Sequence, residues 1–207
     1  AAFLNKIYCN GFTKLDVGKT RYGLMLREDG IAMDDGTAAR LAEDHFVVTT
    51  TTANAVGVYR HMEFARQVLW PDMDVQLIST TESWAQYAVA GPNARNLLRK
   101  IVDAEFDISN EAFPFMACGA ITVCDGLRAR LFRISFSGEL AYEIAVPTRY
   151  GDAMIRALIE AGEEFGGCAY GTEALGVMRI EKGHATGNEL NGTTTALNLG
   201  MGHMVST

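Results

Sequence analysis

The sequence has little of what metal sites and redox motifs require. Its four cysteines, Cys9, Cys118, Cys124 and Cys168, lie far apart, and none forms the C-x-x-C pair of zinc ribbons or thioredoxin-like proteins. No group of His, Asp and Glu residues has the spacing of metal ligands, so no metal site is expected. Reduced, buried thiols in a cytoplasmic protein are the simplest interpretation of the four cysteines.

The signals of several other functional classes are missing as well. There is no G-x-x-x-x-G-K-[ST] motif, and the glycines near the end of the chain do not open the βαβ unit that a dinucleotide site needs. No apolar run approaches the roughly 20 residues that cross a bilayer, and the first residues lack the pattern of a secretory signal. The formal net charge is −7, with Lys and Arg scattered, so no basic face for nucleic acid is expected.

The composition that is present suits a globular protein. Of the 207 residues, 48% are hydrophobic and 21% are charged, which is enough for one well-buried domain or two small ones. Residues 1–9 read as a helix without a capping residue ahead of it. Apolar Met204 and Val205 suggest a strand that has just begun. The sequence is therefore expected to be a fragment of a longer protein, truncated at both ends.

The periodicity predicts antiparallel strands and helices in one α+β domain. Strands over 19–27, 31–41 (with a bend at 34–36) and 45–52 should form a three-stranded meander. A helix over 54–69, with Val58, Met62, Ala65 and Leu69 at the spacing of one apolar face, should be capped by Asn54 and stopped by Pro71. The remaining elements are expected as strands over 84–90, 115–123, 127–135 and 141–146, and as helices over 94–102, 148–162 and 170–182. Such short strand connections disfavour a doubly wound parallel sheet.

The first candidate for chemistry is the pair Asp34-Asp35 before Gly36. Adjacent residues of a strand point to opposite faces, so one carboxylate can face a cavity while the other faces water. A carboxylate in an apolar cavity can hold or take a proton near a reacting amine. The alternative is a solvated bend beside Gly36.

The second candidate is RISFSGELAYE, residues 133–143. Ser137-Gly138-Glu139 reads as a tight turn, and Glu143 follows in an otherwise apolar strand. Buried Glu is rare unless it is paired or binds a ligand, and a heterocycle with adjacent N–H and NH₂ donors, such as a pterin, would satisfy both oxygens. The alternative is an exposed Glu on the outer face of an edge strand.

The third candidate is MRIEKGH, residues 178–184, at the end of the last predicted helix. Arg179 and Glu181 can form an internal ion pair or meet a charged ligand. Lys182 is explained by the favourable placement of a positive charge at a helix end. His184 is expected to be structural rather than catalytic.

Five segments occur in the order and spacing of one protein family. They are YCNGFTKLDVGKTRYGLMLREDGIAMDDG, VVTTTTAN, VAGPNARNLL, RISFSGELAYEI and ALGVMRIEKGH. Together they resemble the aminomethyltransferase (glycine-cleavage T-protein) family of folate-binding proteins, over essentially the whole chain. The version here is most similar to the branch found in sarcosine oxidase alpha subunits, because Gly30-Ile31 and Phe136 stand where T-proteins usually carry Gly-Gly and Tyr.

The resemblance assigns roles to residues. The family's catalytic carboxylate falls on Asp35, with Asp34 the alternative if the bend shifts by one position. Its pterin-contacting tyrosine falls on Tyr22, and the glutamate that binds the pterin edge falls on Glu143. Asp35 and Glu143 are thereby expected to point into one hollow.

Three further positions follow from the same resemblance. The small polar residue that lines the pterin pocket falls on Thr51, with Asn54 close by. Arg179 matches the family's R-x-E pattern and is available for the glutamate carboxylates of folate, unless it is structural.

The resemblance implies a function for the parent protein. Residues 1–207 would be its folate-binding domain, with an N-terminal strand and helix and a C-terminal barrel domain lying outside. The region would bind tetrahydrofolate and capture the one-carbon unit from sarcosine oxidation as 5,10-methylenetetrahydrofolate. FAD, FMN and NAD are expected only elsewhere in a complex with the other sarcosine oxidase subunits.

Other functions within reach of the resemblance stay open. One is a true glycine-cleavage aminomethyltransferase, which needs a lipoyl carrier protein and no flavin. Another is a non-catalytic folate-family scaffold that mediates subunit assembly. The tRNA-modification branch is disfavoured, because its K-G-C-Y-x-G-Q-E type motif corresponds here to KGHATGNE, which has no cysteine.

Overall fold

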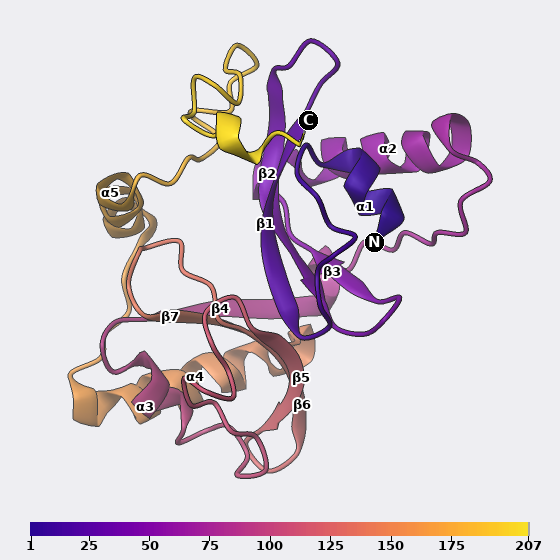
Figure 1. The fold of residues 1–207 in the computed structure, drawn as a ribbon. Coiled ribbons are helices and arrows are strands. Elements are labelled where there is room, and N and C mark those ends of the chain that lie inside the picture. Colours follow the sequence, from indigo (N-terminus) through magenta and orange to yellow (C-terminus); the bar gives the residue numbers. More distant parts are fainter. Residues whose placement is uncertain (207) are drawn as a thin grey trace. The chain divides into compact units, whose positions relative to one another are not determined.

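The computed structural model describes residues 1–206 and divides the chain into two compact units (Figure 1). Unit 1 contains Ala1–Ser79 together with the segment that starts at Ala185, and unit 2 contains Thr80–His184. What the sequence presents as one domain over 1–207 is thus built from two units, each with its own sheet.

The sheet of unit 1 is the predicted antiparallel meander. Its strands are β1 (Lys19–Leu26), β2 (Ala32–Arg40) and β3 (Phe46–Val48), in the order β1-β2-β3, which confirms the meander. The bend predicted within β2 is wrong, because Asp34, Asp35 and Gly36 pair in regular register with Met25, Leu24 and Gly23. The register shift lies instead between Met25 and Leu26.

Helices cover one face of this sheet. They are α1 (Ala2–Ile7) and α2 (Ala55–Phe64), and α2 continues as a π-helical turn over Ala65–Leu69. Val58, Met62 and Ala65 are buried as their helical spacing predicted, but Leu69 is 47% exposed. The wider π turn rotates the chain out of the 3.6-residue period, so the prediction for Leu69 was wrong.

The C-terminal segment packs on the other face of the sheet. Ala32 N donates to Thr194 O at 2.8 Å, and Leu24, Ala32 and Ala196 form a small buried cluster. The prediction of a strand at Met204 and Val205 is wrong, because Gly202–Met204 forms a 3₁₀ turn. The last described hydrogen bond runs from Ser206 N to Cys9 O, 2.8 Å.

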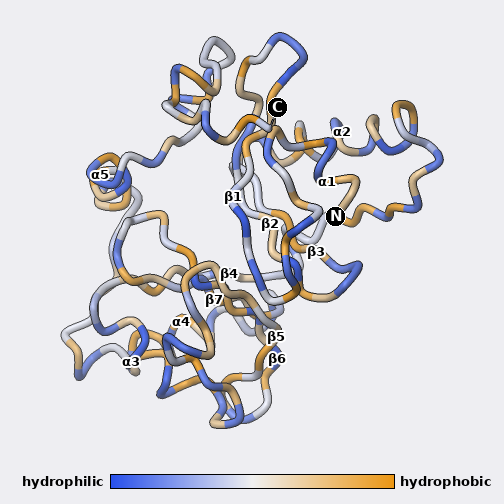
Figure 2. Tube along the Cα trace, in the orientation of Figure 1, coloured by the Kyte–Doolittle hydropathy of each residue, from blue (hydrophilic) through white to orange (hydrophobic). Residues whose placement is uncertain are grey.

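Unit 2 is a four-stranded antiparallel sheet with helices. Its strands, β4 (Trp84–Ala90), β5 (Cys118–Val123), β6 (Leu127–Phe132) and β7 (Ala141–Pro147), lie in the order β4-β7-β6-β5. The core of the unit packs α3 (Ala94–Leu98) and α4 (Gly151–Gly162) against one face, and Figure 2 shows the hydrophobic stretches along β5, β6 and β7. α5 (Thr172–Lys182) ends at Gly183. Antiparallel sheets with helices confirm the α+β class.

The cysteines are all free thiols, but only some are buried. Cys118 is buried and Cys9 partly so, whereas Cys124 and Cys168 are exposed, which corrects the expectation of buried thiols. Within residues 1–206, no cluster of three or more His, Cys, Asp or Glu side chains is placed to hold a metal ion. No helix in the same range is long and apolar enough to cross a membrane.

Gly36 is required by a close backbone crossing. A Cβ atom at this position would lie 2.0 Å from Thr49 O. Gly36→Ala is therefore expected to destabilise the protein by about 2 kcal/mol or more, because neither backbone can yield without breaking sheet pairing. The change is measured by urea denaturation. Gly176→Ala, where an added Cβ meets nothing within 4 Å, is the control; equal stabilities of the two variants would contradict this account.

Candidate functional site

β2 presents the two adjacent carboxylates to opposite faces of the sheet of unit 1. Asp34 is only 1% exposed, whereas Asp35 is partly exposed. Opposite faces follow from the two-residue period of a strand. The solvated-bend alternative is wrong, because it requires both carboxylates in water.

Asp35 lies beside two hydroxyl groups. Tyr22 Oη donates to Asp35 Oδ2 at 2.7 Å, and Thr51 Oγ1 donates to Oδ1 at 3.3 Å. Burial and the negative charge of Asp35 raise the pKa of Tyr22 well above its usual range. Tyr22 therefore stays a protonated donor, and the two hydroxyls fix the orientation of the carboxylate.

Asp34 is held on the buried side. Its oxygens accept from Thr51 N at 3.2 Å and from Asn54 Nδ2 at 3.3 Å, and the same amide donates to Met33 O at 2.9 Å. Burial raises the pKa of Asp34, and these hydrogen bonds oppose the rise. The Asn54 side chain makes no capping bond to α2, although Asn54 occupies the N-cap position.

Five of the predicted residues thus gather in unit 1: Tyr22, Asp34, Asp35, Thr51 and Asn54. Thr51 connects the two carboxylates, with its backbone on Asp34 and its hydroxyl on Asp35. The close crossing at Gly36 ends β3 at Val48 and brings Thr49–Thr51 over β2. The predicted longer third strand was therefore wrong for a local steric reason.

Two residues that lie near this cluster were not predicted as site residues from the sequence. Met201 Sδ lies 3.8 Å from Tyr22 Oη, 179 positions away along the chain. Tyr8 is 4% exposed, and its hydroxyl has no hydrogen-bond partner within residues 1–206. Burial and the charges of Asp34 and Asp35 raise the pKa of Tyr8. The proximity of Tyr8 and Met201 to the carboxylates could not be predicted from the sequence pattern, because only the folded chain brings these residues together.

Asn54→Ala is expected to destabilise the protein by about 2 kcal/mol, because it removes one of the donors to a buried carboxylate and the side-chain donor to Met33 O. The loss should be larger at pH 8 than at pH 5. Removing the donor raises the pKa of Asp34 further, and a raised carboxyl pKa costs stability as the pH rises through it. Urea denaturation at both pH values, with exposed Asn96→Ala as control, measures the effect; a loss independent of pH would contradict the role of Asp34.

In unit 2, Glu143 lies on an interior strand. β7 is flanked by β4 and β6, so the edge-strand alternative is wrong. Glu143 Oε2 accepts from Gln86 Nε2, and no residue within the described part donates to Oε1. Burial raises the pKa of Glu143, and the bond from Gln86 opposes the rise.

Arg179 lies on α5 in unit 2 and is 8% exposed. Its Nη1 donates to His184 O at 3.2 Å, across the end of the helix. His184 Nδ1 lies 2.8 Å from Phe136 O, and its ring stacks on that of Phe136 at 5.7 Å. These contacts suit a structural role for His184, and folate binding by Arg179 stays a prediction.

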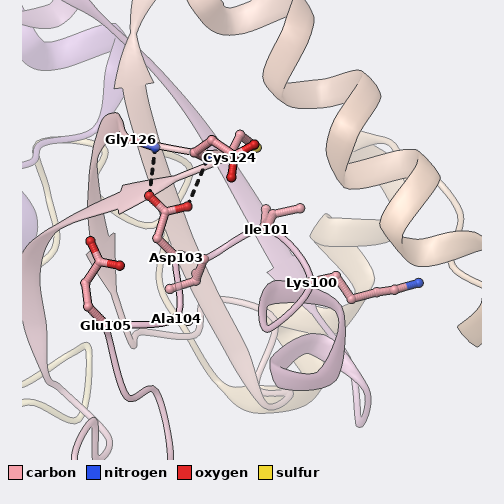
Figure 3. A pocket seen from close by; sticks show the side chains of 9 residues that line it. Lys100, Ile101, Asp103, Ala104, Glu105, Cys124 and Gly126 are labelled. Atoms are coloured by element: carbon pink, nitrogen blue, oxygen red, sulfur yellow. Dashed lines mark hydrogen bonds between the residues drawn. The ribbon is translucent and has the colours of Figure 1, made fainter.

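A hollow of about 550 Å³ opens elsewhere in unit 2, between residues 100–105 and 124–126 (Figure 3). None of the predicted site residues lines it. Asp103, its most enclosed acid, accepts from the backbone N–H groups of Asp125 and Gly126 at 2.9 and 2.8 Å. The carboxylate thus supports the turn after β5.

The chain belongs to the GCVT N-terminal domain family, which matches residues 1–207. Sarcosine oxidase subunit alpha of Rhizobium meliloti (strain 1021) is 59% identical over 207 residues, which are 100% of this chain and 21% of that protein. The chain thus spans about a fifth of this relative. The resemblance seen in the sequence motifs is confirmed.

Two solved structures share the fold. Glycine cleavage system aminomethyltransferase T from Bartonella henselae matches with a TM-score of 0.83 at 24% identity, over 100% of this chain and 52% of that one. Heterotetrameric sarcosine oxidase from Corynebacterium sp. U-96 in complex with pyrrole 2-carboxylate matches with a TM-score of 0.58 at 17% identity, over 82% of this chain and 76% of that one.

Proposed function

We propose that this region binds tetrahydrofolate within a sarcosine oxidase alpha subunit and captures the one-carbon unit of sarcosine oxidation. The proposal is supported by the family membership and by the 59% identity to the Rhizobium meliloti subunit. The single structural observation that carries it is Asp35, a partly exposed carboxylate oriented by the hydroxyls of Tyr22 and Thr51.

The residues fit a reduced pterin. A pterin edge presents adjacent N–H and NH₂ donors, and Glu143 offers one carboxylate oxygen that accepts from Gln86 and another that no described residue engages. Because Glu143 is desolvated, a donor pair would relieve the cost of its negative charge. Glu143 would therefore hold the heterocycle by its edge.

Tetrahydrofolate would supply the nucleophilic nitrogen that accepts the one-carbon unit. The part of Asp35 is electrostatic: a fixed anion stabilises positive charge at the reacting amine or imine, and it can also take a proton there. Tyr22 and Thr51 keep the carboxylate from turning. Asp34, on the buried face, holds Thr51 in place.

The experiment is an assay of the full-length protein with sarcosine and tetrahydrofolate. Sarcosine-dependent peroxide and 5,10-methylenetetrahydrofolate are the expected products. Methylenetetrahydrofolate made only from an aminomethyl-loaded lipoyl carrier protein would support the glycine-cleavage alternative. A protein that shows no heat of tetrahydrofolate binding in calorimetry would support the scaffold alternative.

The proposed assembly follows the same relatives. We infer that the parent protein works in the cytoplasm, in a hetero-oligomer with other sarcosine oxidase subunits, and that FAD, FMN and NAD bind elsewhere in this complex. The heterotetrameric Corynebacterium enzyme supports this part of the proposal. Copurification of the full-length protein with flavin and with further subunits would test it.

A further inference from the structure

The sheet of unit 2 has two chemically different faces. Tyr142, Ile144 and Val146 of β7 point to the face that packs in the core with α3 and α4. Alternation therefore sends Glu143 and Ala145 to the second face. The neighbouring strands β4 and β6 place Gln86 and Arg130 on that face, because both pair directly with Ala145.

Arg130 on this second face has an unusual environment. Its guanidinium lies over the Trp84 ring at 3.8 Å from the centroid. Burial lowers the pKa of Arg130. Within residues 1–206, the guanidinium forms no hydrogen bond or ion pair. A desolvated cation without an acceptor is costly, and a planar guanidinium stacked on an indole is preorganised to bind an oxygen acceptor.

Glu143 and Arg130 lie near each other but do not form a hydrogen bond or ion pair with each other. Phe132 pairs with Glu143 and Arg130 with Ala145, so the two charged residues are diagonal across β6 and β7. Diagonal positions of an antiparallel pair are separated by about 7–8 Å. Glu143 is instead engaged by Gln86, and small Ala145 stands between Gln86 and Arg130. This face therefore carries a desolvated acceptor and a desolvated donor side by side.

We propose that Arg130, supported by Trp84, binds an oxygen of the ligand that Glu143 holds by its donor edge. The inference rests on the proposed function and assigns Arg130 a part in ligand specificity. The ligand class is a heterocycle with an N–H and NH₂ edge plus a nearby carbonyl or carboxylate oxygen. In a folate, that oxygen is either the oxo group of the pterin or a carboxylate of the glutamate tail.

Calorimetry of the full-length protein with two ligands tests the inference. Tetrahydrofolate carries both oxygens, whereas 6-methyltetrahydropterin has the pterin ring and no tail. Arg130→Met is expected to weaken tetrahydrofolate binding about tenfold, the usual effect of losing a charge-assisted hydrogen bond. Equal weakening for 6-methyltetrahydropterin assigns the pterin oxygen, and unchanged binding of that ligand assigns the tail.

Matched variants keep the test decisive. Arg128→Met, on the same strand but exposed, should leave both affinities unchanged, and Arg130→Lys should restore only part of the loss because lysine lacks the planar fork. Unchanged affinities in folded Arg130→Met, with Glu143→Gln weakened, would overturn this inference alone. A wild-type protein that binds neither ligand would overturn the proposed function and this inference together.

Discussion

Asp35→Asn is expected to lower the rate of 5,10-methylenetetrahydrofolate formation by about 100-fold or more in the full-length protein, with flavin turnover unchanged. The amide keeps the shape, and its single oxygen can still accept from one of the two hydroxyls, Tyr22 or Thr51, while its NH₂ group faces the other. What it loses is the negative charge, which is the property that the one-carbon chemistry is proposed to use. The measurement is the rate of methylenetetrahydrofolate production from sarcosine, alongside flavin reduction in the same samples.

The matched control for this variant is Asp44→Asn. Asp44 is an exposed acid between β2 and β3, so its removal changes the net charge by the same amount without touching the cluster. Wild-type rates are expected there. If Asp35→Asn made methylenetetrahydrofolate at the wild-type rate, Asp35 would have no role in the chemistry.

Glu143→Gln is expected to weaken tetrahydrofolate binding by about tenfold to a hundredfold, because an ionised acceptor of two donors is replaced by a neutral one. Wild-type affinity should also fall as the pH drops. Burial raises the pKa of Glu143 above its ordinary value of 4.5, and protonation removes the acceptor that the donor edge needs. The acid limb of binding should therefore lie above pH 4.5 and be absent in Glu143→Gln.

Calorimetric titrations at several pH values measure both parts of this prediction. Glu139→Gln is the control, because Glu139 is an exposed glutamate in the turn before β7. Its affinity and acid limb should match the wild type. An acid limb that persists unchanged in Glu143→Gln would assign the titration to another group.

Much of the fold was predictable because it follows from local chemistry. The two-residue period put Asp34 and Asp35 on opposite faces, and short connections required antiparallel strands. Which of the two carboxylates is buried was not predictable from the pattern. It depends on Thr51 and Asn54, which reach Asp34 only because the chain crosses Gly36 closely.

The features that could not be predicted from the sequence also have specific physical causes. The edge-strand alternative for Glu143 stayed open because the order β4-β7-β6-β5 is set by pairing across more than 50 residues. The prediction that Leu69 lies on the buried face was wrong because no sequence pattern predicts the π turn. Met201 reaches Tyr22 only after the C-terminal segment returns to unit 1. These features depend on tertiary contacts, which override local preference.

The most direct test of the central claim is hydrogen exchange of the full-length protein with and without tetrahydrofolate. The proposed roles of Asp35 and Glu143 predict slower exchange, each as a separate result, in peptides that cover Thr49–Asn54 and in peptides that cover β7. Peptides that line the hollow at residues 100–105 should not change. Slowing confined to segments outside this chain, with both site segments unaffected, would contradict the assignment of the folate site to these residues.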